Sequence, residues 1–495
     1  MSSLGYLQIH RLANARPLTR ADRAVLPDPE ALPLHERTRT PLLTIEQQRP
    51  AGEAHVIAFS HAYELELAGL VKCLELSAVA PLARDRSAGD PLVVIGGPIT
   101  FSNPLPTAPF ADLMILGEAE ETFPRLLERL ERDPEAARGS AAKRRALLEE
   151  LAGEPGFYVP SLHGERLPAI GRAPDELLPA WSAIRTPDTE LHDMVLIEPE
   201  RGCHRGCTFC VMRRSTNGGM RVVSPERVSA LVPADAPRVG LVGAAVSDHP
   251  GLEDILRELV DVRGIEVGIS SLRADRLNAE LVGLLARGGY RSMTVALDAA
   301  SARLRVAIEK NLREHHVERA AELAKEAGMR HLKIYVIVGL PDETDDDREE
   351  LAQLALRLRK ILPVKLGVSP FVPKLHTPLA LAPFLGEAET DRVLAQLRRR
   401  LGGKVELRGP GAREAYVEYR LAQGGHAHAG AAIAAAKGGG TLAAWKRALA
   451  DLPERVQPPN LAELVPLSAA DRRRQVQARG AGARAARENG AAPRP

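Results

Sequence analysis

Strand-like and helical segments alternate along the second half of the chain, and this alternation constrains the fold more than any other feature of the sequence. Six short apolar segments indicate strands, with helical patterns between them. Strands that alternate with helices favour a parallel sheet. Six units are too few for a closed eight-unit barrel, so we expect a partial (βα)6 barrel of the TIM type. The expected strands are 194–199, 238–243, 266–271, 291–297, 332–339 and 365–371.

Two of the helices between these strands can be placed from the sequence. The clearest begins at Ser301, a good N-cap residue, and continues to Gly328, where a glycine suits the end of a helix. A second helix follows the acidic run 342–347. In barrels of this kind the chemistry collects where the strands end, at their carboxyl edge. We therefore expect functional residues at those strand ends.

A shorter alternation of the same kind precedes the barrel. Strand-like segments at 55–60, 92–98 and 112–117 accompany a helical stretch at 64–76. The expected fold class is α/β, with a Rossmann-like N-terminal domain, the partial barrel and a small mixed, mostly helical C-terminal region. The expected divisions are an irregular segment with one short helix at 1–50, the Rossmann-like domain at 51–135, a connector at 136–190, the barrel core at 191–400, an accessory region at 401–470 and a disordered tail at 471–495.

Three cysteines lie within eight positions, directly after the first expected barrel strand. They are Cys203, Cys207 and Cys210. Thiolates are the preferred ligands of iron–sulfur clusters, and three thiolates on a cluster of four irons leave one iron open. A structural zinc site needs four closed ligands, and His204 is poorly placed to be the fourth because it adjoins Cys203. We interpret the motif as a 4Fe–4S site and assign no role to the remaining cysteine, Cys73.

The charge balance argues against nucleic acid and membranes as general partners. The chain carries 66 basic and 64 acidic residues, for a net charge of +2. A charge so nearly balanced gives no broad attraction to nucleic acid or to membranes. No apolar run reaches the roughly 18 residues that span a bilayer, and the N-terminus has no compact apolar stretch followed by a small-residue cleavage site. We expect a cytoplasmic protein.

The spacing C-x3-C-x2-C at the end of the first strand of an incomplete barrel resembles the radical S-adenosylmethionine (SAM) superfamily, over about residues 190–400. The resemblance implies that the three cysteines are catalytic metal ligands and that the open iron binds SAM. Reductive cleavage of SAM then gives a 5′-deoxyadenosyl radical, which takes a hydrogen atom from the substrate. A reductant such as flavodoxin or ferredoxin is implied as a partner. The substrate is not implied, and methyl transfer is one of several reactions left open.

The resemblance also suggests SAM contacts near the cysteines and on the second strand. Phe209, just before the last cysteine, matches an aromatic residue that commonly touches the adenine. The second strand ends in Gly243-Ala244-Ala245, where relatives often have Gly-Gly-Glu and bind the SAM amino group through backbone carbonyls. Gly243 is therefore a candidate contact, although the acidic residue of the motif is lost.

Later strand ends supply the other suggested SAM contacts. Ser271 and Arg273, after the third strand, match positions that serve the ribose and carboxylate of SAM, and an Arg–carboxylate pair suits that role. Asp298 and Ser301, after the fourth strand, stand where relatives often carry Pro-Glu-x-Gly-Ser. Gly339, at the end of the fifth strand, matches the segment that backs the adenine. As an alternative, Arg273 and Asp298 could simply form a surface ion pair.

The N-terminal α/β domain resembles the cobalamin-binding-like domain found ahead of many radical SAM domains. The segments Ile95-Gly96-Gly97-Pro98 and Gly117-Glu118-Ala119-Glu120-Glu121 carry this likeness. Many cobalamin binders place a histidine in Asp-x-His-x-x-Gly to ligate cobalt, and His61 lacks that spacing. Cobalamin therefore stays open as a cofactor, without support from a His-ligand motif, and we favour a domain that has lost it or binds it without histidine.

Two other functions are compatible with the motif. The first is an iron–sulfur protein that carries electrons or senses redox state without cleaving SAM, and loss of Arg273 or Asp298 would hardly affect it. The second is an RNA-modification factor that relies on the basic tail at 471–495, with RNA affinity that falls steeply with salt. Methylthiotransferases usually carry a second three-cysteine cluster, and with only Cys73 outside the motif this chain does not fit them.

Overall fold

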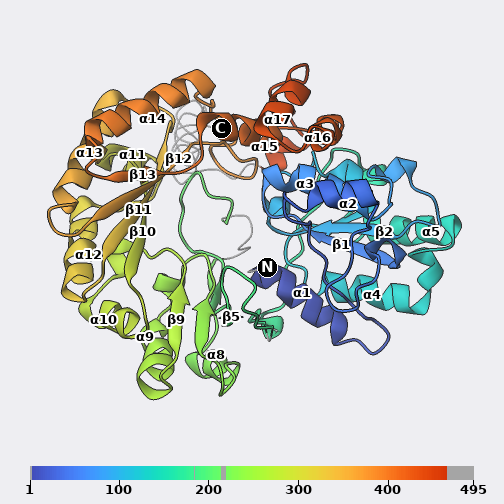
Figure 1. Cartoon of the computed structure of the whole chain (residues 1–495), viewed down its shortest axis with the longest axis horizontal. Coiled ribbons are helices and arrows are strands. Elements are labelled where there is room, and N and C mark those ends of the chain that lie inside the picture. Colours follow the sequence, from blue (N-terminus) through green and yellow to red (C-terminus); the bar gives the residue numbers. More distant parts are fainter. Residues whose placement is uncertain (1–2, 183, 213–218, 465–495) are drawn as a thin grey trace, which may run out of the picture.

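The chain forms two α/β parts that lie side by side (Figure 1). The computed structural model describes residues 3–182, 184–212 and 219–464, and the tail expected at 471–495 lies outside them. One part carries a four-stranded sheet, and the other carries the strands of the expected barrel. Within the described residues no helix is long and apolar enough to cross a membrane.

The N-terminal sheet, here called the sheet of domain one, has three parallel strands and one antiparallel edge strand, in the order β1-β2-β3-β4. Its elements are β1 (Val56–Ser60), α3 (Leu67–Leu76), β2 (Leu92–Gly96), β3 (Leu113–Ile115), α4 (Thr122–Arg132), α5 (Ala141–Ala152) and β4 (Phe157–Tyr158). Along β2, Val93 and Ile95 join the core on the side of α3, whereas Leu92 and Val94 join the core on the side of α4 and α5. Burial on both faces explains why β2 is a continuous apolar run in the sequence.

Helices from the C-terminal end of the chain return to domain one (Figure 1). They are α15 (Ala412–Ala422), α16 (His428–Lys437) and α17 (Leu442–Leu449), with the short α18 (Leu461–Leu464) after them. Trp445 and Leu449 are fully buried in the same core as Leu70 and Val71 of α3. The alanine-rich α16 packs against α3, because its small side chains allow two helices to approach closely. Segments more than 300 residues apart in sequence thus share one core.

The N-terminal segment contains two helices where one short helix was expected. They are α1 (Leu4–Asn14) and α2 (Leu32–Thr38). Leu4 and Leu7 of α1 are buried against Ala180 and Leu196, and Leu196 belongs to the first barrel strand. The N-terminus is therefore anchored on the barrel by apolar burial.

All six expected barrel strands are present, and a seventh short strand extends the sheet. Three form one parallel sheet and four form a second, and a bridge between Leu272 and Val295 connects the two. The first sheet contains β5 (Met194–Ile197), β8 (Arg238–Leu241) and β9 (Glu266–Ile269). The second contains β10 (Ser292–Ala299), β11 (His331–Val338), β12 (Val364–Pro370) and the unexpected β13 (Glu406–Arg408).

Helices cover the outside of these strands, and one expected helix is in fact two. They are α8 (Pro225–Ala230), α9 (Leu252–Leu256), α10 (Ala279–Arg287), α11 (Ala302–Ala307), α12 (Glu314–Glu326), α13 (Asp345–Leu358) and α14 (Glu387–Leu401). The single helix expected from Ser301 to Gly328 is wrong, because the chain breaks between α11 and α12. Glu309 and Asn311 there have φ of 57° and 54°, left-handed values that end a right-handed helix.

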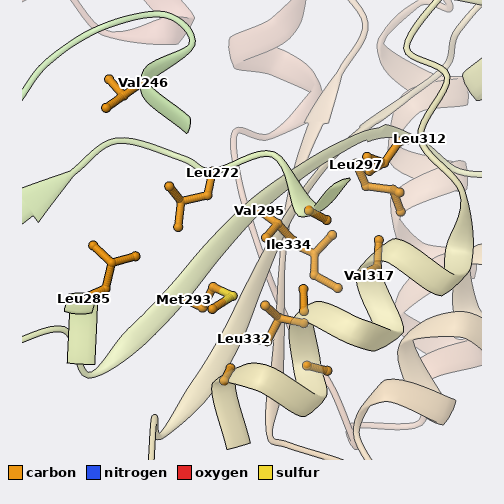
Figure 2. Close-up of a cluster of buried hydrophobic side chains, with 14 of the residues drawn as sticks. Val246, Leu272, Leu285, Met293, Val295, Leu297, Leu312, Val317, Leu332 and Ile334 are labelled. Atoms are coloured by element: carbon orange, nitrogen blue, oxygen red, sulfur yellow. The ribbon is translucent and has the colours of Figure 1, made fainter. Parts of the chain in front are cut away.

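A buried core lies between the barrel strands and their outer helices (Figure 2). Met293 and Val295 of β10 are fully buried in it, and Val317 of α12 packs into the same cluster. The alternate residues of β10 are only half buried, because successive side chains of a strand point to opposite faces. Asp298 is on this second, less packed face.

Candidate active site at the strand ends of the barrel

The three cysteines lie on one segment that follows the first barrel strand. The chain first forms β6 (Glu200–Arg201), which pairs antiparallel with β7 (Arg221–Val222). Cys203, Cys207 and Cys210 follow β6; Cys207 is buried and the other two are half buried. Burial raises the pKa of all three thiols, to about 12 for Cys210. Binding of a metal centre must therefore displace their protons.

Hydrogen bonds hold the cysteine segment to two other barrel elements. The N–H of Thr208 donates to the carbonyl of Ile308 at 3.0 Å, at the end of α11, and the carbonyl of Thr208 accepts the N–H of Leu379 at 3.4 Å, in the segment after β12. Within the segment, the N–H of Arg205 lies 3.4 Å from the sulfur of Cys203. The segment is therefore fixed across the barrel between distant parts of the chain.

Asp248 anchors the cysteine segment to the second strand of the barrel. Its carboxylate is fully buried and accepts two hydrogen bonds from Arg205, at 2.6 and 3.0 Å, and one from Arg276 at 2.7 Å. Burial alone would raise the pKa of Asp248, but the hydrogen bonds from the two arginines hold it below its ordinary value. His204 is nearly half exposed and lies 4.0 Å from the same carboxylate.

The three cysteines are the donor types that a three-thiolate cluster needs, and their side chains are not yet gathered round one point in the structure. In the part of the chain that the structure describes, no three His, Cys, Asp or Glu side chains are placed to hold a single metal ion. The fourth cysteine, Cys73, belongs to α3 of domain one, where burial raises its pKa to about 12. Three thiols on one anchored segment are the ligands that a 4Fe–4S cluster with one open iron requires.

The end of the second strand contains Gly243 and an unexpected carboxylate beside it. The carbonyl of Gly243 accepts a hydrogen bond from the hydroxyl of Ser270 at 3.2 Å. Glu200 is fully buried, and its Oε1 accepts the N–H of Ala245 at 2.7 Å. Its Oε2 has no hydrogen-bond partner among the described residues. Burial raises the pKa of Glu200 to about 7. The sequence motif alone did not indicate Glu200.

Arg273 occupies the end of the third strand, next to the exposed Ser271. Its Nε and Nη2 each lie 3.0 Å from an oxygen of Asp275, and its N–H donates to Ser247 at 3.0 Å. The guanidinium is largely buried, so a planar two-point contact fixes its orientation. The surface ion pair with Asp298 considered from the sequence does not form. Phe209 is half buried and packs against the barrel core.

Asp298 lies at an irregularity near the end of β10 and pairs with a lysine that sequence analysis missed. The register of β10 against β11 shifts between Ala296 and Asp298, and Asp298 has a φ of 64°. Lys310 donates a hydrogen bond to its carboxylate. Besides burial, the charges of Lys310 and Asp298 act on the pKa of Cys207, so this ion pair is close to the cysteine segment.

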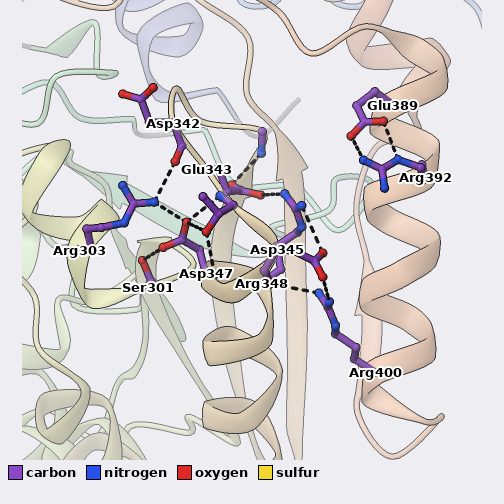
Figure 3. Close-up of polar contacts among 12 residues, drawn as sticks. Ser301, Arg303, Asp342, Glu343, Asp345, Asp347, Arg348, Glu389, Arg392 and Arg400 are labelled. Atoms are coloured by element: carbon purple, nitrogen blue, oxygen red, sulfur yellow. Dashed lines mark hydrogen bonds and ion pairs between the residues drawn. The ribbon is translucent and has the colours of Figure 1, made fainter.

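Ser301 belongs to a polar network at the ends of β10 and β11 (Figure 3), and Gly339 bonds to Glu343 of the same network. Ser301 caps α11 by accepting the N–H of Leu304 at 3.2 Å, and its hydroxyl donates to Asp347. Gly339 has a φ of 80°, and its N–H donates to Glu343 at 2.9 Å. Both residues therefore shape the strand ends through contacts within the protein.

The strand ends of domain one do not present a histidine to a cobalt ion. The Nε2 of His61 lies 2.9 Å from the carbonyl of Tyr63, and its Nδ1 lies 3.0 Å from the hydroxyl of Thr107. Burial lowers the pKa of His61 to about 4, so the ring is neutral with both nitrogens engaged. Nearby, Asn103 donates to the carbonyls of Ala422 and Gly424 in the C-terminal region, at 3.1 and 2.8 Å. His61 does not fit the role of a cobalt ligand.

Two family models match most of these two parts. The family described as "Radical SAM proteins, N-terminal" matches residues 5–160, and the "Radical SAM superfamily" matches residues 197–355. An uncharacterized protein of Methanocaldococcus jannaschii is 30% identical over 327 residues, which are 64% of this chain and 67% of that protein.

Other similarities are partial or structural. The 2-(S-pantetheinyl)-carbapenam-3-carboxylate methyltransferase of Streptantibioticus cattleyicolor is 31% identical over 159 residues, which are 30% of this chain and 22% of that enzyme. The radical SAM methyltransferase TsrM of Kitasatospora setae, solved with tryptophan and a SAM analogue, has a similar fold. The TM-score is 0.53 at 15% identity, and the match covers 77% of this chain and 72% of that chain.

Proposed function

Because this chain belongs to the radical SAM superfamily, and is a radical SAM enzyme, we propose that Cys203, Cys207 and Cys210 hold the 4Fe–4S cluster with which it cleaves SAM. The observation that carries the assignment is the anchored cysteine segment. It places three thiols at the strand ends of a parallel, open barrel, and hydrogen bonds fix it on both sides. When bound and reduced, such a cluster supplies the electron that splits SAM into methionine and a 5′-deoxyadenosyl radical.

The residues around the cysteines would bind and orient SAM. Arg273 would bind the carboxylate of SAM, because Asp275 holds its Nε and Nη2 and leaves Nη1 outside that pair. The carbonyl of Gly243 would accept a hydrogen bond from the amino group of SAM, beside the one that it accepts from Ser270. Ser271, exposed beside Arg273, would contact the ribose.

Two further groups would complete the pocket. Phe209 would contact the adenine, since it is half exposed directly before Cys210. Asp298 and Lys310 would set the local charge on the opposite strand. Ser301 and Gly339 would act on this site by fixing the strand ends, because the hydroxyl of Ser301 and the N–H of Gly339 already bond to carboxylates of the protein.

The reductant and the cellular compartment follow from the same chemistry. A low-potential one-electron donor such as flavodoxin or ferredoxin would reduce the cluster. Free thiols and an iron–sulfur cluster suit a reducing compartment, so we place the protein in the cytoplasm. The substrate class is open, and the basic tail at 471–495, on which the RNA-modification alternative relies, lies outside the described residues.

Methyl transfer is the second form that this activity could take. It is supported by the partial likeness to the carbapenam methyltransferase. Cobalamin would then have to bind domain one without His61, and the titration of the protein with hydroxocobalamin, followed by visible absorbance, tests this. The control is His61→Gln, which should leave any binding unchanged, because both nitrogens of His61 are engaged within the protein.

The proposed function is tested by anaerobic reconstitution with iron and sulfide. The wild type should hold about four irons per chain and should release 5′-deoxyadenosine from SAM when dithionite is added. The triple variant Cys203→Ala, Cys207→Ala, Cys210→Ala should lose both properties. Cys73→Ala is the matched control and should keep both. Release of 5′-deoxyadenosine by the triple variant at the wild-type rate would refute the assignment.

A further inference from the structure

The two strands of the β6–β7 pair, which precedes the cysteine segment at β6, are bound to the same loop of domain one. In the β6–β7 pair, Arg201 lies directly opposite Arg221, so the chain leaves this pair at one arginine and returns at the other. Both guanidinium groups contact the loop that follows β3, which contains Glu118 and Glu120. A loop about 80 to 100 residues away in sequence thus holds both arginines.

The contacts between the arginines and this loop are short and largely buried. Arg221 donates to Oε1 of Glu118. The Nη2 of Arg201 lies 2.5 Å from Oε1 of Glu120, and its Nη1 lies 3.7 Å from Oε2 of Glu118. The side chains of Glu118 and Glu120 are 5% and 7% exposed. Because these charges are out of water, each needs its partner to offset the cost of burial.

Glu118 is itself held by a backbone hydrogen bond in addition to its contacts with the arginines. Its Oε2 accepts the N–H of Ala173 at 2.8 Å. The preceding Gly117 has a φ of 93°, and a β-carbon there would come within 2.4 Å of the carbonyl oxygen of Gly171. The hydrogen bond to Ala173 and the close approach of Gly117 to Gly171 therefore restrict the position of Glu118.

Arg201 has a second carboxylate partner on its own side of the interface. Its Nε and Nη2 donate to the two oxygens of Glu198 at 2.8 and 2.7 Å. Burial alone would lower the pKa of Arg201, but Glu198 and Glu120 hold it above its ordinary value. Among the described residues Arg221 has no such two-point partner; besides Glu118, it donates to the carbonyl of Ala173 and to the exposed Asp175. Glu118 is therefore the main buried carboxylate for Arg221.

We propose that Glu118 of domain one is a positioning residue for the iron–sulfur site: through Arg221 and Arg201 it fixes the β6–β7 pair, from which the cysteine segment begins. This inference rests on the proposed function for its link to the cluster. Domain one would thus support the chemistry of the barrel even if it binds no cofactor itself. Glu118 acts only through the arginines and touches no reacting atom.

The first test measures the cysteine segment without any cluster, by amide hydrogen exchange of the full-length protein. Glu118→Gln keeps the shape of the side chain and removes its charge. We expect exchange to become several-fold faster in peptides that cover Gly202–Met212, with little change in the barrel helices. The control is Glu131→Gln, since the side chain of Glu131 is also largely buried, at 12% exposed, but pairs with Arg16 of the N-terminal segment. Exchange that is the same in the two variants would overturn the proposal.

The second test follows the cluster in reconstituted protein. Glu118→Gln should hold fewer irons per chain than Glu131→Gln, and the electron paramagnetic resonance (EPR) spectrum of its reduced form should be broadened, because the ligands adopt more than one geometry. Arg221→Lys keeps the charge but loses the planar fork of the guanidinium. Its iron content and the sharpness of its EPR spectrum should lie between those of the wild type and those of Arg221→Met. An Arg221→Lys spectrum no better than that of Arg221→Met would argue against a directed contact.

A double-mutant cycle separates positioning from general loss of folding. If Glu118 acts through Arg221, the variant with both Glu118→Gln and Arg221→Met should lose no more iron than the worse single variant. Additive losses of iron in the double variant would contradict the proposal. So would a Glu118→Gln variant whose thermal unfolding midpoint falls as much as that of Glu131→Gln and whose cysteine segment is otherwise unchanged.

The outcomes also distinguish this proposal from the proposed function. If the wild type builds no cluster, the cluster assignment is refuted. If Glu118→Gln nevertheless shows faster exchange at 202–212, the positioning role of Glu118 is still supported. A wild type that builds the cluster and cleaves SAM, with Glu118→Gln equal to it in exchange, iron content and spectrum, would refute the positioning role alone.

Discussion

Glu200 occupies the space beside Gly243: a β-carbon on Gly243 would come within 2.2 Å of Oε1 of Glu200. That same oxygen accepts the N–H of Ala245 at 2.7 Å. The Gly243-Ala244-Ala245 segment has no acidic residue of its own, and Glu200 of β6 provides one. The side chain of Glu200 can therefore occupy this place only because residue 243 is a glycine, a dependence that the sequence of either segment does not show.

Gly243→Ala should weaken SAM binding because its new methyl group displaces Glu200. Overpacking of this kind costs about 1–3 kcal/mol, so we expect the dissociation constant for SAM, measured by equilibrium dialysis, to rise at least several-fold. Gly430→Ala is the control, since nothing lies within 4 Å of its β-carbon position. Equal affinities in Gly243→Ala and wild type would show that this strand end does not contact SAM.

The ionisation of Glu200 should make folding stability fall as the pH rises. Burial raises its pKa from 4.5 in the unfolded chain to about 7 in the folded protein. The folded state therefore binds the proton more tightly, and the stability linked to it is complete below about pH 4.5 and lost by about pH 7. Glu200→Gln should stabilise the cluster-free protein at pH 8 by up to about 3 kcal/mol and have little effect at pH 5. Urea unfolding at the two pH values measures this, and an equal effect at both would disprove it.

Asp248→Asn should release the cysteine segment from the second strand. Breaking a buried ion pair costs about 3–5 kcal/mol, and Asp248 is fully buried between Arg205 and Arg276. We expect this loss in urea unfolding, together with reduced iron incorporation. Asp261→Asn removes a comparable but exposed pair with Arg287 and should cost less than about 1 kcal/mol. Similar losses in both variants would contradict an anchoring role for Asp248.

Arg273→Lys should raise the KM for SAM with a smaller change in kcat. A lysine keeps the charge but cannot hold Asp275 at two points and also bind a carboxylate. We expect a KM about tenfold higher, measured from 5′-deoxyadenosine release over a range of SAM concentrations. Arg287→Lys, on the outer surface of the barrel, is the control. If Arg273→Lys keeps the wild-type KM, the carboxylate of SAM binds elsewhere.

The strands were predictable because each is a local pattern. Burial on both faces makes β2 a continuous apolar run, and all six expected barrel strands appear close to their expected bounds. The break between α11 and α12 was not predictable in this way, because the residues from Ser301 to Gly328 keep a helical pattern through it. The left-handed residues Glu309 and Asn311 bring Lys310 to Asp298, a contact that depends on tertiary structure.

In the candidate site, too, local sequence patterns were predictable and contacts between distant segments were not. The cysteines could be found from spacing alone, because one short segment carries all three ligands. Glu200 and Lys310 could not be found in this way, since the contact of each is with a residue that folding brings close, Ala245 and Asp298 respectively. The contact of Glu118 with Arg221 spans more than 100 residues, and no periodic pattern connects positions so far apart.

The most direct test of the central claim is the EPR spectrum of the reduced, reconstituted protein before and after SAM is added. Three thiolates leave one iron without a protein ligand, so that iron is free to bind SAM. We expect a 4Fe–4S signal whose shape changes on addition of SAM and which is absent in the triple cysteine variant. A 4Fe–4S signal that SAM leaves unchanged would contradict the account and favour an iron–sulfur protein that only transfers electrons.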